Sequence, residues 1–198
     1  MLNVKGQRLK VKGQRSKVKG QMLQARRGGS KVKGLYTGRF QPFHLGHLSA
    51  VKQALSETDF LYICVGSAQY DHEPKNPFTF KERAEMIRLS LEDSGISDKR
   101  YQILPLPDIH DNDKWPAYVL NTAPDFSIVF VGDDGIVKEL FEKHTKIPVK
   151  IVKKEIPVCA TDIRNEIKNN GDWKKYLTHS TAEYLNKMNA AERIVSKN

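Results

Sequence analysis

Short apolar segments alternate with helical patterns along residues 31–198, and this alternation constrains the fold more than any other feature of the sequence. The segment 60–65, for example, is continuously apolar, which is typical of a parallel strand buried on both faces. Strands are predicted at residues 31–37, 60–65, 101–106, 126–131 and 149–152, with a helical pattern after each. The sequence therefore predicts an α/β fold, a doubly wound parallel sheet with right-handed crossovers and a C-terminal helical extension.

The formal net charge of +10 comes from the N-terminal residues rather than from the predicted sheet. Of the 33 Lys and Arg residues, 11 lie in residues 1–33, which contain no Asp or Glu, so the rest of the chain has 22 basic and 23 acidic groups. Residues 4–21 repeat a seven-residue unit with a glycine each time, which disfavours a coiled coil. We predict a disordered basic extension at 1–32 and one domain at 33–198, with C-terminal helices from about residue 161.

Two interpretations of the basic extension remain open. One is an arm that contacts RNA or an acidic surface, and the other is a low-complexity extension that precedes a true start nearer Met22. The first interpretation predicts RNA binding that weakens steeply with salt and is lost when residues 1–33 are removed.

Composition also bears on the cellular location. No apolar run is long enough to cross a membrane, and no apolar segment follows the basic N-terminus as it does in a signal peptide. The two cysteines, Cys64 and Cys159, do not make a disulfide framework. These features predict a cytoplasmic protein without a membrane partner.

Residues 36–47 read Tyr-Thr-Gly-Arg-Phe-Gln-Pro-Phe-His-Leu-Gly-His and are predicted to join the first strand to the first helix. The start of a helix has unpaired N–H groups and a partial positive charge, so such a junction can bind phosphate. Gly38 leaves space for a ligand, and Arg39 adds a planar charged fork that suits phosphate. His44 and His47 are three residues apart, so they share a face in the first helical turn.

A second junction between a strand and a helix is predicted at residues 161–164, more than a hundred residues later. Ligands of open α/β sheets bind at the carboxyl ends of the strands, so both junctions should face one crevice. Two helix N-termini, two arginines and two histidines would then surround a polyphosphate, which is the set that nucleotidyl transfer requires. The glycine motif of dehydrogenases and the P-loop of kinases are both absent from the sequence.

The longer sequence Gly-Arg-Phe-Gln-Pro-Phe-His-Leu-Gly-His resembles the His-x-Gly-His signature of the nucleotidylyltransferase superfamily, in the form found in archaeal-type nicotinamide mononucleotide (NMN) adenylyltransferases. Residues 66–69, 76–86 and 108–115 also resemble that family, and the resemblance covers about residues 33–195. The second motif keeps the family's Thr161 and Arg164 but has Cys159 and Ala160 in place of Ser and Gly. Asp133 stands where the family usually has Asn. The resemblance implies a Rossmann-like nucleotidylyltransferase fold.

The resemblance also implies the reaction and its residues. AMP would be transferred from ATP to NMN, forming NAD and pyrophosphate, with Mg²⁺ held mainly by the ATP phosphates and no metal site on the protein. The implied catalytic residues are Arg39, His44, His47 and Arg164. The implied ATP-binding residues are Gly38, Arg39, Phe40, His44, His47, Gly132, Asp133, Thr161 and Arg164. The implied NMN-binding residues are Ser67, Gln69, Asn112 and Trp115, with the pyridinium ring stacked on the Trp115 indole.

The sequence leaves alternatives open for the acceptor, for the class of function and for the role of Trp115. The same machinery transfers AMP to flavin mononucleotide (FMN) or phosphopantetheine, or a cytidylyl group to an alcohol phosphate. A non-catalytic nucleotide or RNA binder is the alternative from another class, although contact with nucleic acid is expected only from the basic extension. Trp115 could instead be a loop anchor packed on the core. The family implies a homo-oligomer, namely a hexamer.

Overall fold

A computed structural model describes residues 31–123, 125–132, 135–153 and 155–195, and Lys33–Asn198 form one compact unit. The extension predicted at 1–32 lies almost entirely outside the described residues, and so does Asp133. None of the described helices is both long enough and apolar enough to span a membrane.

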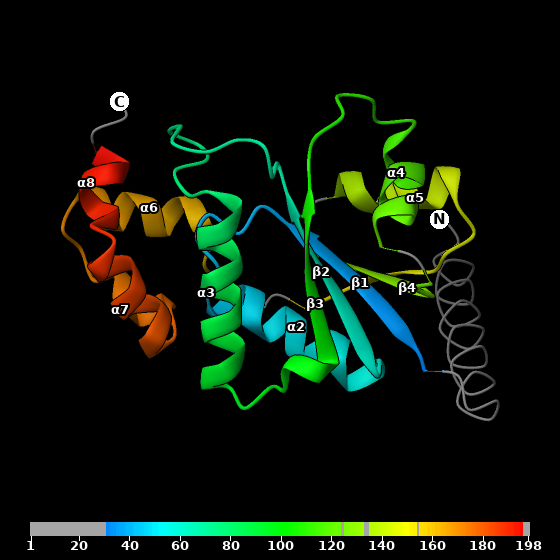
Figure 1. Ribbon diagram of the computed structural model, residues 1–198, viewed down its shortest axis with the longest axis horizontal. Helices are drawn as coiled ribbons and strands as arrows, with labels where there is room; N and C mark the ends of the chain where they lie inside the picture. Colours follow the sequence, from blue (N-terminus) through cyan, green and yellow to red (C-terminus); the bar gives the residue numbers. More distant parts are fainter. Residues whose placement is uncertain (1–30, 124, 133–134, 154, 196–198) are drawn as a thin grey trace, which may run out of the picture. The chain divides into compact units, whose positions relative to one another are not determined.

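Five parallel strands form the sheet, so the predicted fold class is confirmed (Figure 1). The strands are β1 (Lys33–Gly38), β2 (Phe60–Gly66), β3 (Tyr101–Leu106), β4 (Ile128–Val131) and β5 (Val149–Ile151). Their order is β3-β2-β1-β4-β5, so the chain builds outward from β1 on one side and then returns to build on the other. β1 and β4 therefore flank the switch point, where ligands of open sheets bind beside the carboxyl ends of the strands.

The helices that follow the strands cover both faces of the sheet. They are α2 (Leu45–Glu57), α3 (Phe80–Asp93), α4 (Trp115–Thr122) and α5 (Gly135–His144), and the 3₁₀ turn η1 (Asp98–Arg100) precedes β3. Helix α6 (Ala160–Lys168) follows β5 and packs against the 3₁₀ turn η2 (Trp173–Tyr176) and the C-terminal helix. α2 packs against β1 and β2, α3 packs against β2, and α4 and α5 pack against each other and against β3 and β5, respectively. The sequence predicts a short helix at residues 117–120, and α4 begins two residues earlier because Pro116 is tolerated in a first helical turn.

The sequence pattern predicts one final helix from about residue 181 to the C-terminus, and here the structure differs. The structure has two helices instead, α7 (His179–Lys187) and α8 (Ala190–Val195). Asn189 lies between them with a φ of 52°. Asparagine tolerates this left-handed conformation, which ends a helix, so the chain turns here without a glycine or a proline.

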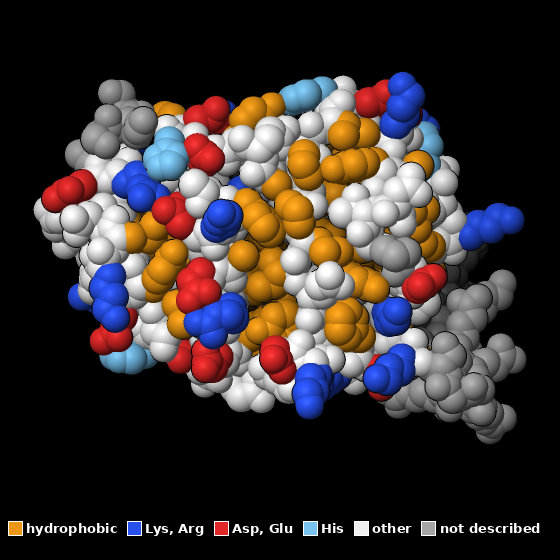
Figure 2. Space-filling model, viewed as in Figure 1, with side chains coloured by type: hydrophobic (Ala, Val, Ile, Leu, Met, Phe, Trp, Pro, Cys, Tyr) orange, Lys and Arg blue, Asp and Glu red, His pale blue; other side chains and the backbone are white. Residues whose placement is uncertain are grey.

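The sheet has a hydrophobic layer on each face, because alternate residues of a strand point in opposite directions. The layer toward α4 and α5 includes Leu35, Tyr62, Cys64, Val129 and Phe141. Cys64 lies in the segment 60–65, which the sequence predicts to be buried, and burial raises the pKa of its thiol to about 12. Figure 2 shows further hydrophobic side chains over the edge strand β3, where Ile103 and Leu104 are partly exposed.

Candidate active site

The turn between β1 and α2 is held by the packing of aromatic rings. Phe40 has a φ of 53°, and its ring lies between 4.9 and 5.8 Å from the rings of Tyr36, Phe43 and His47, centroid to centroid. A Cβ atom on Gly38 would lie only 2.8 Å from the Phe40 ring, which real Cβ contacts essentially never do. Glycine is therefore required at position 38 because Phe40 folds over it, a reason that the sequence does not reveal.

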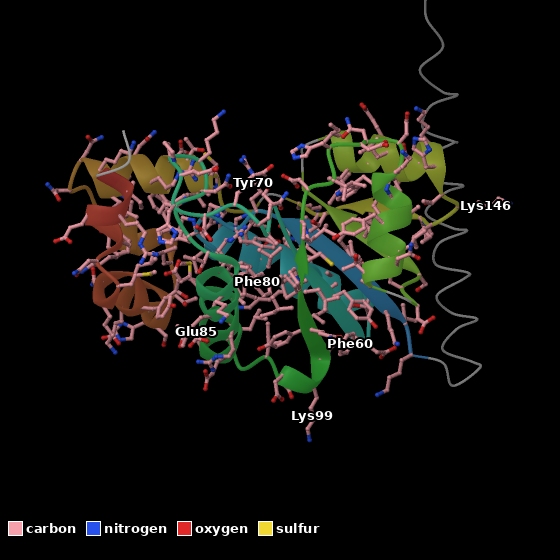
Figure 3. All side chains as sticks on the ribbon, turned by 45° about the horizontal axis from the view of Figure 1, so that its top comes forward. Phe60, Tyr70, Phe80, Glu85, Lys99 and Lys146 are labelled. Carbon is pink, nitrogen blue, oxygen red and sulfur yellow. The ribbon has the colours of Figure 1, made fainter. Side chains whose placement is uncertain are left out.

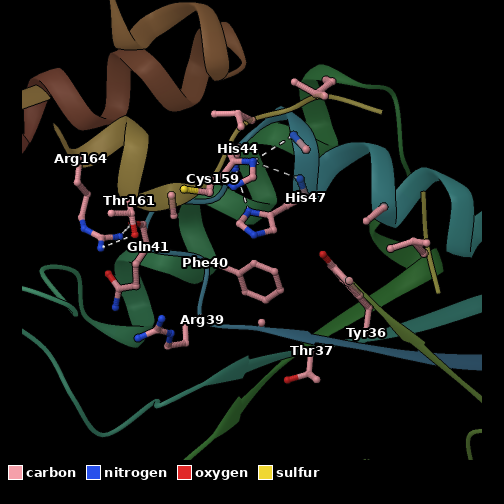
Figure 4. Close-up of a pocket in the computed structure, with 18 of the residues that line it drawn as sticks. Tyr36, Thr37, Arg39, Phe40, Gln41, His44, His47, Cys159, Thr161 and Arg164 are labelled. Carbon is pink, nitrogen blue, oxygen red and sulfur yellow. Dashed lines mark hydrogen bonds between the residues drawn. The ribbon is translucent and has the colours of Figure 1, made fainter. Parts of the chain in front are cut away.

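His44 and His47 cap helix α2 through their ring nitrogens (Figure 4). Nδ1 of His44, the N-cap residue, accepts hydrogen bonds from the N–H groups of Gly46 at 3.1 Å and His47 at 3.4 Å. Nδ1 of His47 accepts in return from the N–H of His44 at 3.3 Å, and the two rings stack at 3.7 Å between centroids. His44 and His47 thus share a face, as predicted, and together form a capping box in which imidazoles replace the usual hydroxyl and carboxylate.

The capping bonds also fix the tautomer of both rings. Because each Nδ1 accepts a hydrogen bond, neutral His44 and His47 are assigned their ring proton at Nε2. Burial, and then the neighbouring His44, hold the pKa of His47 well below its usual value. A neutral imidazole with its donor at Nε2 can bond an anionic oxygen without changing its own protonation state.

The lowered pKa of His47 predicts a loss of stability in acid. Below about pH 6.5 an unfolded His47 takes up a proton that the folded ring does not, so the free energy of unfolding should fall as the pH decreases. Urea denaturation at pH 7.5, 6.5 and 5.5 measures this dependence. His47→Gln keeps a capping-box acceptor but does not titrate, so its stability should fall less over this range. Equal pH dependence in the two proteins would contradict the assignment.

Helix α6 begins at Ala160, and Cys159, which stands where the family has Ser, is its N-cap residue. Sγ of Cys159 accepts from the N–H of Asp162 at 3.4 Å and donates to Oδ2 of the same residue at 3.0 Å. The guanidinium of Arg164 donates to the carbonyl oxygen of Gln41 at 2.7 Å and to Oγ1 of Thr161 at 3.2 Å. The bond to Gln41 joins the two junctions directly, although 123 positions separate its partners in sequence.

The two junctions border one cavity of about 390 Å³ (Figure 4). The described residues of the predicted ATP set all line it, namely Gly38, Arg39, Phe40, His44, His47, Gly132, Thr161 and Arg164. None of the described residues that line this cavity is acidic. Burial, and then the charge of Arg39, lower the pKa of Arg164, so an anion placed between the two arginines would relieve their repulsion. The cavity is therefore suited to a polyphosphate.

Lys153 lines the same cavity and was not among the predicted residues. Its backbone is held by Gln53 of α2, whose Nε2 donates to the Lys153 carbonyl oxygen at 2.9 Å while Oε1 accepts from the Lys153 N–H at 2.9 Å. These partners are 100 residues apart, so no local pattern predicts the link. The sequence does hold one indication of Lys153, because it is a basic residue directly after the strand predicted at 149–152, where ligands of such sheets bind.

A second cavity, of about 420 Å³, meets the first at Thr37, Gly38 and Arg39, which line both. Ser67, Asn112 and Trp115 of the predicted NMN set line it as well, whereas Gln69 does not. The sequence allows two interpretations of Trp115, either a stacking partner for NMN or a loop anchor packed on the core. In the structure it borders the cavity and also packs edge-on against Phe141, with 5.8 Å between ring centroids.

Gln69 holds the backbone of Asp108, a residue that lines the second cavity. Its Nε2 donates to the carbonyl oxygen of Asp108 at 2.9 Å, and its Oε1 accepts from the Asp108 N–H at 2.9 Å. Oγ of Ser67 donates to the Asp108 carboxylate at 2.8 Å. Both polar atoms of the Gln69 carboxamide thus bond the backbone, so the described contacts favour a positioning role over the predicted contact with NMN.

Comparisons with known proteins agree with this geometry. The family model described as cytidylyltransferase-like matches residues 35–185. A nicotinamide-nucleotide adenylyltransferase from Thermococcus kodakarensis is 38% identical over 162 residues, which cover 82% of this chain and 86% of that relative. One from Saccharolobus solfataricus is 39% identical over 162 residues, which cover 82% and 94%. The chain belongs to the nicotinamide-nucleotide adenylyltransferase family. The resemblance drawn from the sequence is therefore confirmed.

A solved structure supports the fold of this adenylyltransferase. The bifunctional NMN adenylyltransferase/ADP ribose pyrophosphatase from Francisella tularensis, complexed with AMP and a manganese ion, superposes with a TM-score of 0.69 at 24% identity. The match covers 84% of this chain and 52% of that one, so the chain spans about half of the bifunctional protein. At this identity the likeness shows the architecture alone, which is the Rossmann-like sheet predicted from the sequence.

Proposed function

We propose that this adenylyltransferase transfers AMP from ATP to the 5′-phosphate of NMN, forming NAD and pyrophosphate. The observation that carries the proposal is the meeting of two cavities at Thr37, Gly38 and Arg39, with the histidine pair in one and Trp115 in the other. The relatives named for this reaction support it, because they align over 82% of the chain. Transfer between two bound substrates needs their phosphates side by side, and adjoining cavities provide this.

In the proposed reaction, a 5′-phosphate oxygen of NMN forms a bond to the α-phosphorus of ATP while the bond from that phosphorus to pyrophosphate breaks. The attacking oxygen is already an anion, so no general base is required. His44 and His47 donate from Nε2 to the α- and β-phosphate oxygens, where negative charge builds in the transition state. Arg39 and Arg164 neutralise the triphosphate and the leaving pyrophosphate.

The acceptor lies in the second cavity in this proposal. The indole of Trp115 stacks on the pyridinium ring, which is positively charged and therefore attracted to an electron-rich aromatic face. Ser67 and Asn112 supply polar contacts from the two loops that border the cavity. Arg39, which lines both cavities, lies where the acceptor phosphate and the α-phosphate of ATP would meet.

Mg²⁺ is proposed as the metal ion of the reaction, bound mainly through phosphate oxygens and water. The first cavity fits an ion that arrives with ATP, because none of its described lining residues is a carboxylate. Within the described ranges no group of three or more His, Cys, Asp or Glu side chains could hold a metal. When bound, the ion would supply positive charge to the phosphates of ATP. A cytoplasmic location and a homo-hexamer stay predictions from the sequence.

One assay tests the proposal. ATP and Mg²⁺ are supplied with NMN, FMN or phosphopantetheine in separate reactions, and the release of pyrophosphate is measured. We expect release with NMN, accompanied by NAD, and an unchanged rate after removal of residues 1–30. Release with another acceptor only would reassign the substrate. No release with any acceptor, together with salt-sensitive RNA binding through residues 1–30, would favour the non-catalytic alternative.

A further inference from the structure

Arg83 is the largest fully buried side chain among the described residues, yet it lines neither cavity. Its Nη1 donates to the carbonyl oxygens of Arg39 at 2.9 Å and Gly66 at 2.8 Å, and its Nη2 donates to that of Ser67 at 3.2 Å. Its Nε donates to the carbonyl oxygen of Thr79 at 3.3 Å. One guanidinium therefore joins the ends of β1 and β2 to the start of α3.

This position is unfavourable for a cation on its own. Phe80 and Glu85, which Figure 3 labels, flank Arg83 in the first turns of α3, close to the partly positive helix N-terminus. Among the described residues its hydrogen-bond partners are carbonyl oxygens rather than carboxylates, and burial lowers its pKa to about 10. The charges of Asp71, Asp108 and Glu82 raise the pKa but do not outweigh burial, and none of the three makes a described hydrogen bond to the guanidinium. A buried cation without a direct ion pair costs stability, so the bonds of Arg83 to backbone carbonyls point to what it holds in place.

The bonds of Arg83 hold the wall that the two cavities share. Arg39 lines both cavities, and Gly66 and Ser67 line the second. Phe40 and Ser67 in these loops have φ angles of 53° and 50°. Residues with side chains adopt this conformation at a cost, and they keep it only where the surroundings hold them. Arg83 bonds the carbonyl directly before Phe40 and the carbonyl of Ser67 itself.

The N-terminal turn of helix α3, which carries Arg83, is itself held in place by hydrogen bonds and an ion pair. The N–H of Glu82 donates to Oγ1 of Thr79 at 3.2 Å, and the N–H of Thr79 donates to Oε2 of Glu82 at 2.8 Å. A Thr followed three residues later by a Glu is the sequence pattern of such a capping box. The other oxygen of Glu82 pairs with Nη1 of Arg193 on α8 at 2.5 Å. The start of α3, from which the Arg83 side chain extends, is therefore tied to α8.

We propose that Arg83 is a positioning residue for the wall between the cavities and that its buried charge acts through this wall on the phosphate of the acceptor. This inference rests on the proposed function, in which NMN occupies the second cavity. A single layer of backbone separates the guanidinium from that cavity, since three of the carbonyls it bonds belong to lining residues. Asp108 and Asp111 line the same cavity and oppose an anion there. A buried charge is screened less than an exposed one, so in this proposal Arg83 offsets these carboxylates and favours a phosphate over an uncharged hydroxyl.

Binding of NMN and of nicotinamide riboside, which lacks the phosphate, tests the proposal by calorimetry. Arg83→Met should weaken the binding of NMN on the order of tenfold more than that of the riboside. Arg83→Lys should keep the preference for NMN, because it keeps the charge, but should lower kcat, because an ammonium cannot bond the carbonyls as a planar fork does. Arg88→Met is the matched control, since Arg88 is an exposed arginine of the same helix that pairs with Glu85 and Glu92. It should leave both affinities unchanged.

Two results with Arg83→Met would overturn the inference, namely unchanged affinities or an equal loss for both ligands. If that variant does not fold, Arg83→Lys decides the matter. A lower kcat with the preference for NMN retained supports the proposal, and either an unchanged kcat or a lost preference overturns it. Turnover of NMN by the wild-type enzyme is measured in the same series. Its absence would refute the proposed function, while the ratio of the two affinities still tests Arg83.

Discussion

Replacing His44 with asparagine is expected to lower kcat on the order of 10²-fold or more and to leave the thermal unfolding midpoint close to that of the wild type. Asparagine is among the best N-cap residues, so its side-chain oxygen can accept the bonds from Gly46 and His47 that Nδ1 of His44 accepts now. It has no group at the place of Nε2, so the proposed donor to the phosphate is lost. Steady-state kinetics and calorimetry of the same preparation measure both effects.

His44→Ala is the matched comparison, because it removes the cap and the donor together. It should lose activity to a similar degree and also lose about 1 kcal/mol of stability, which is roughly 2–4 °C in the unfolding midpoint of a protein of this size. A His44→Asn enzyme with the wild-type rate would show that the imidazole serves only as a cap. A midpoint as low as that of His44→Ala would show that the cap was assigned wrongly.

The sequence was sufficient for the fold because the deciding signals are local. Continuous apolar runs such as 60–65 predict buried parallel strands, and Thr79 with Glu82 predicts the start of α3. The break between α7 and α8 was not predicted, because it rests on a single residue, Asn189, in a left-handed conformation. Asparagine occurs in many other contexts, so its presence alone does not end a helix in a prediction.

The predicted cavity-lining residues come from patterns near the strand ends, whereas the supports of the site come from long-range contacts. Three glutamines each bond the N–H and the C=O of one distant residue, and the pairs are Gln41 with Phe78, Gln53 with Lys153, and Gln69 with Asp108. A glutamine at the rim of a site looks like a ligand in the sequence, as Gln69 did. Only the folded structure shows that its carboxamide already has backbone partners.

Arg39→Met is expected to lower kcat/KM for ATP and for NMN together, each on the order of 10²-fold, because Arg39 lines both cavities. Arg164 lines the first cavity and not the second, so Arg164→Met should raise KM for ATP more than KM for NMN. Initial rates with one substrate varied and the other saturating separate the two effects. Arg39→Lys should recover part of the rate, because the charge is kept while the planar fork is lost.

The comparison of the two arginines decides whether the cavities act as one site. If Arg39→Met affects only ATP, as Arg164→Met is expected to, then the acceptor phosphate does not reach the shared wall and the second cavity holds something other than NMN. If both substrates are affected, the reacting phosphates meet at Arg39. The backbone of Arg39 is fixed by Arg83 and its side chain is exposed, so the substitution removes charge at this wall with little change to the packing beneath it.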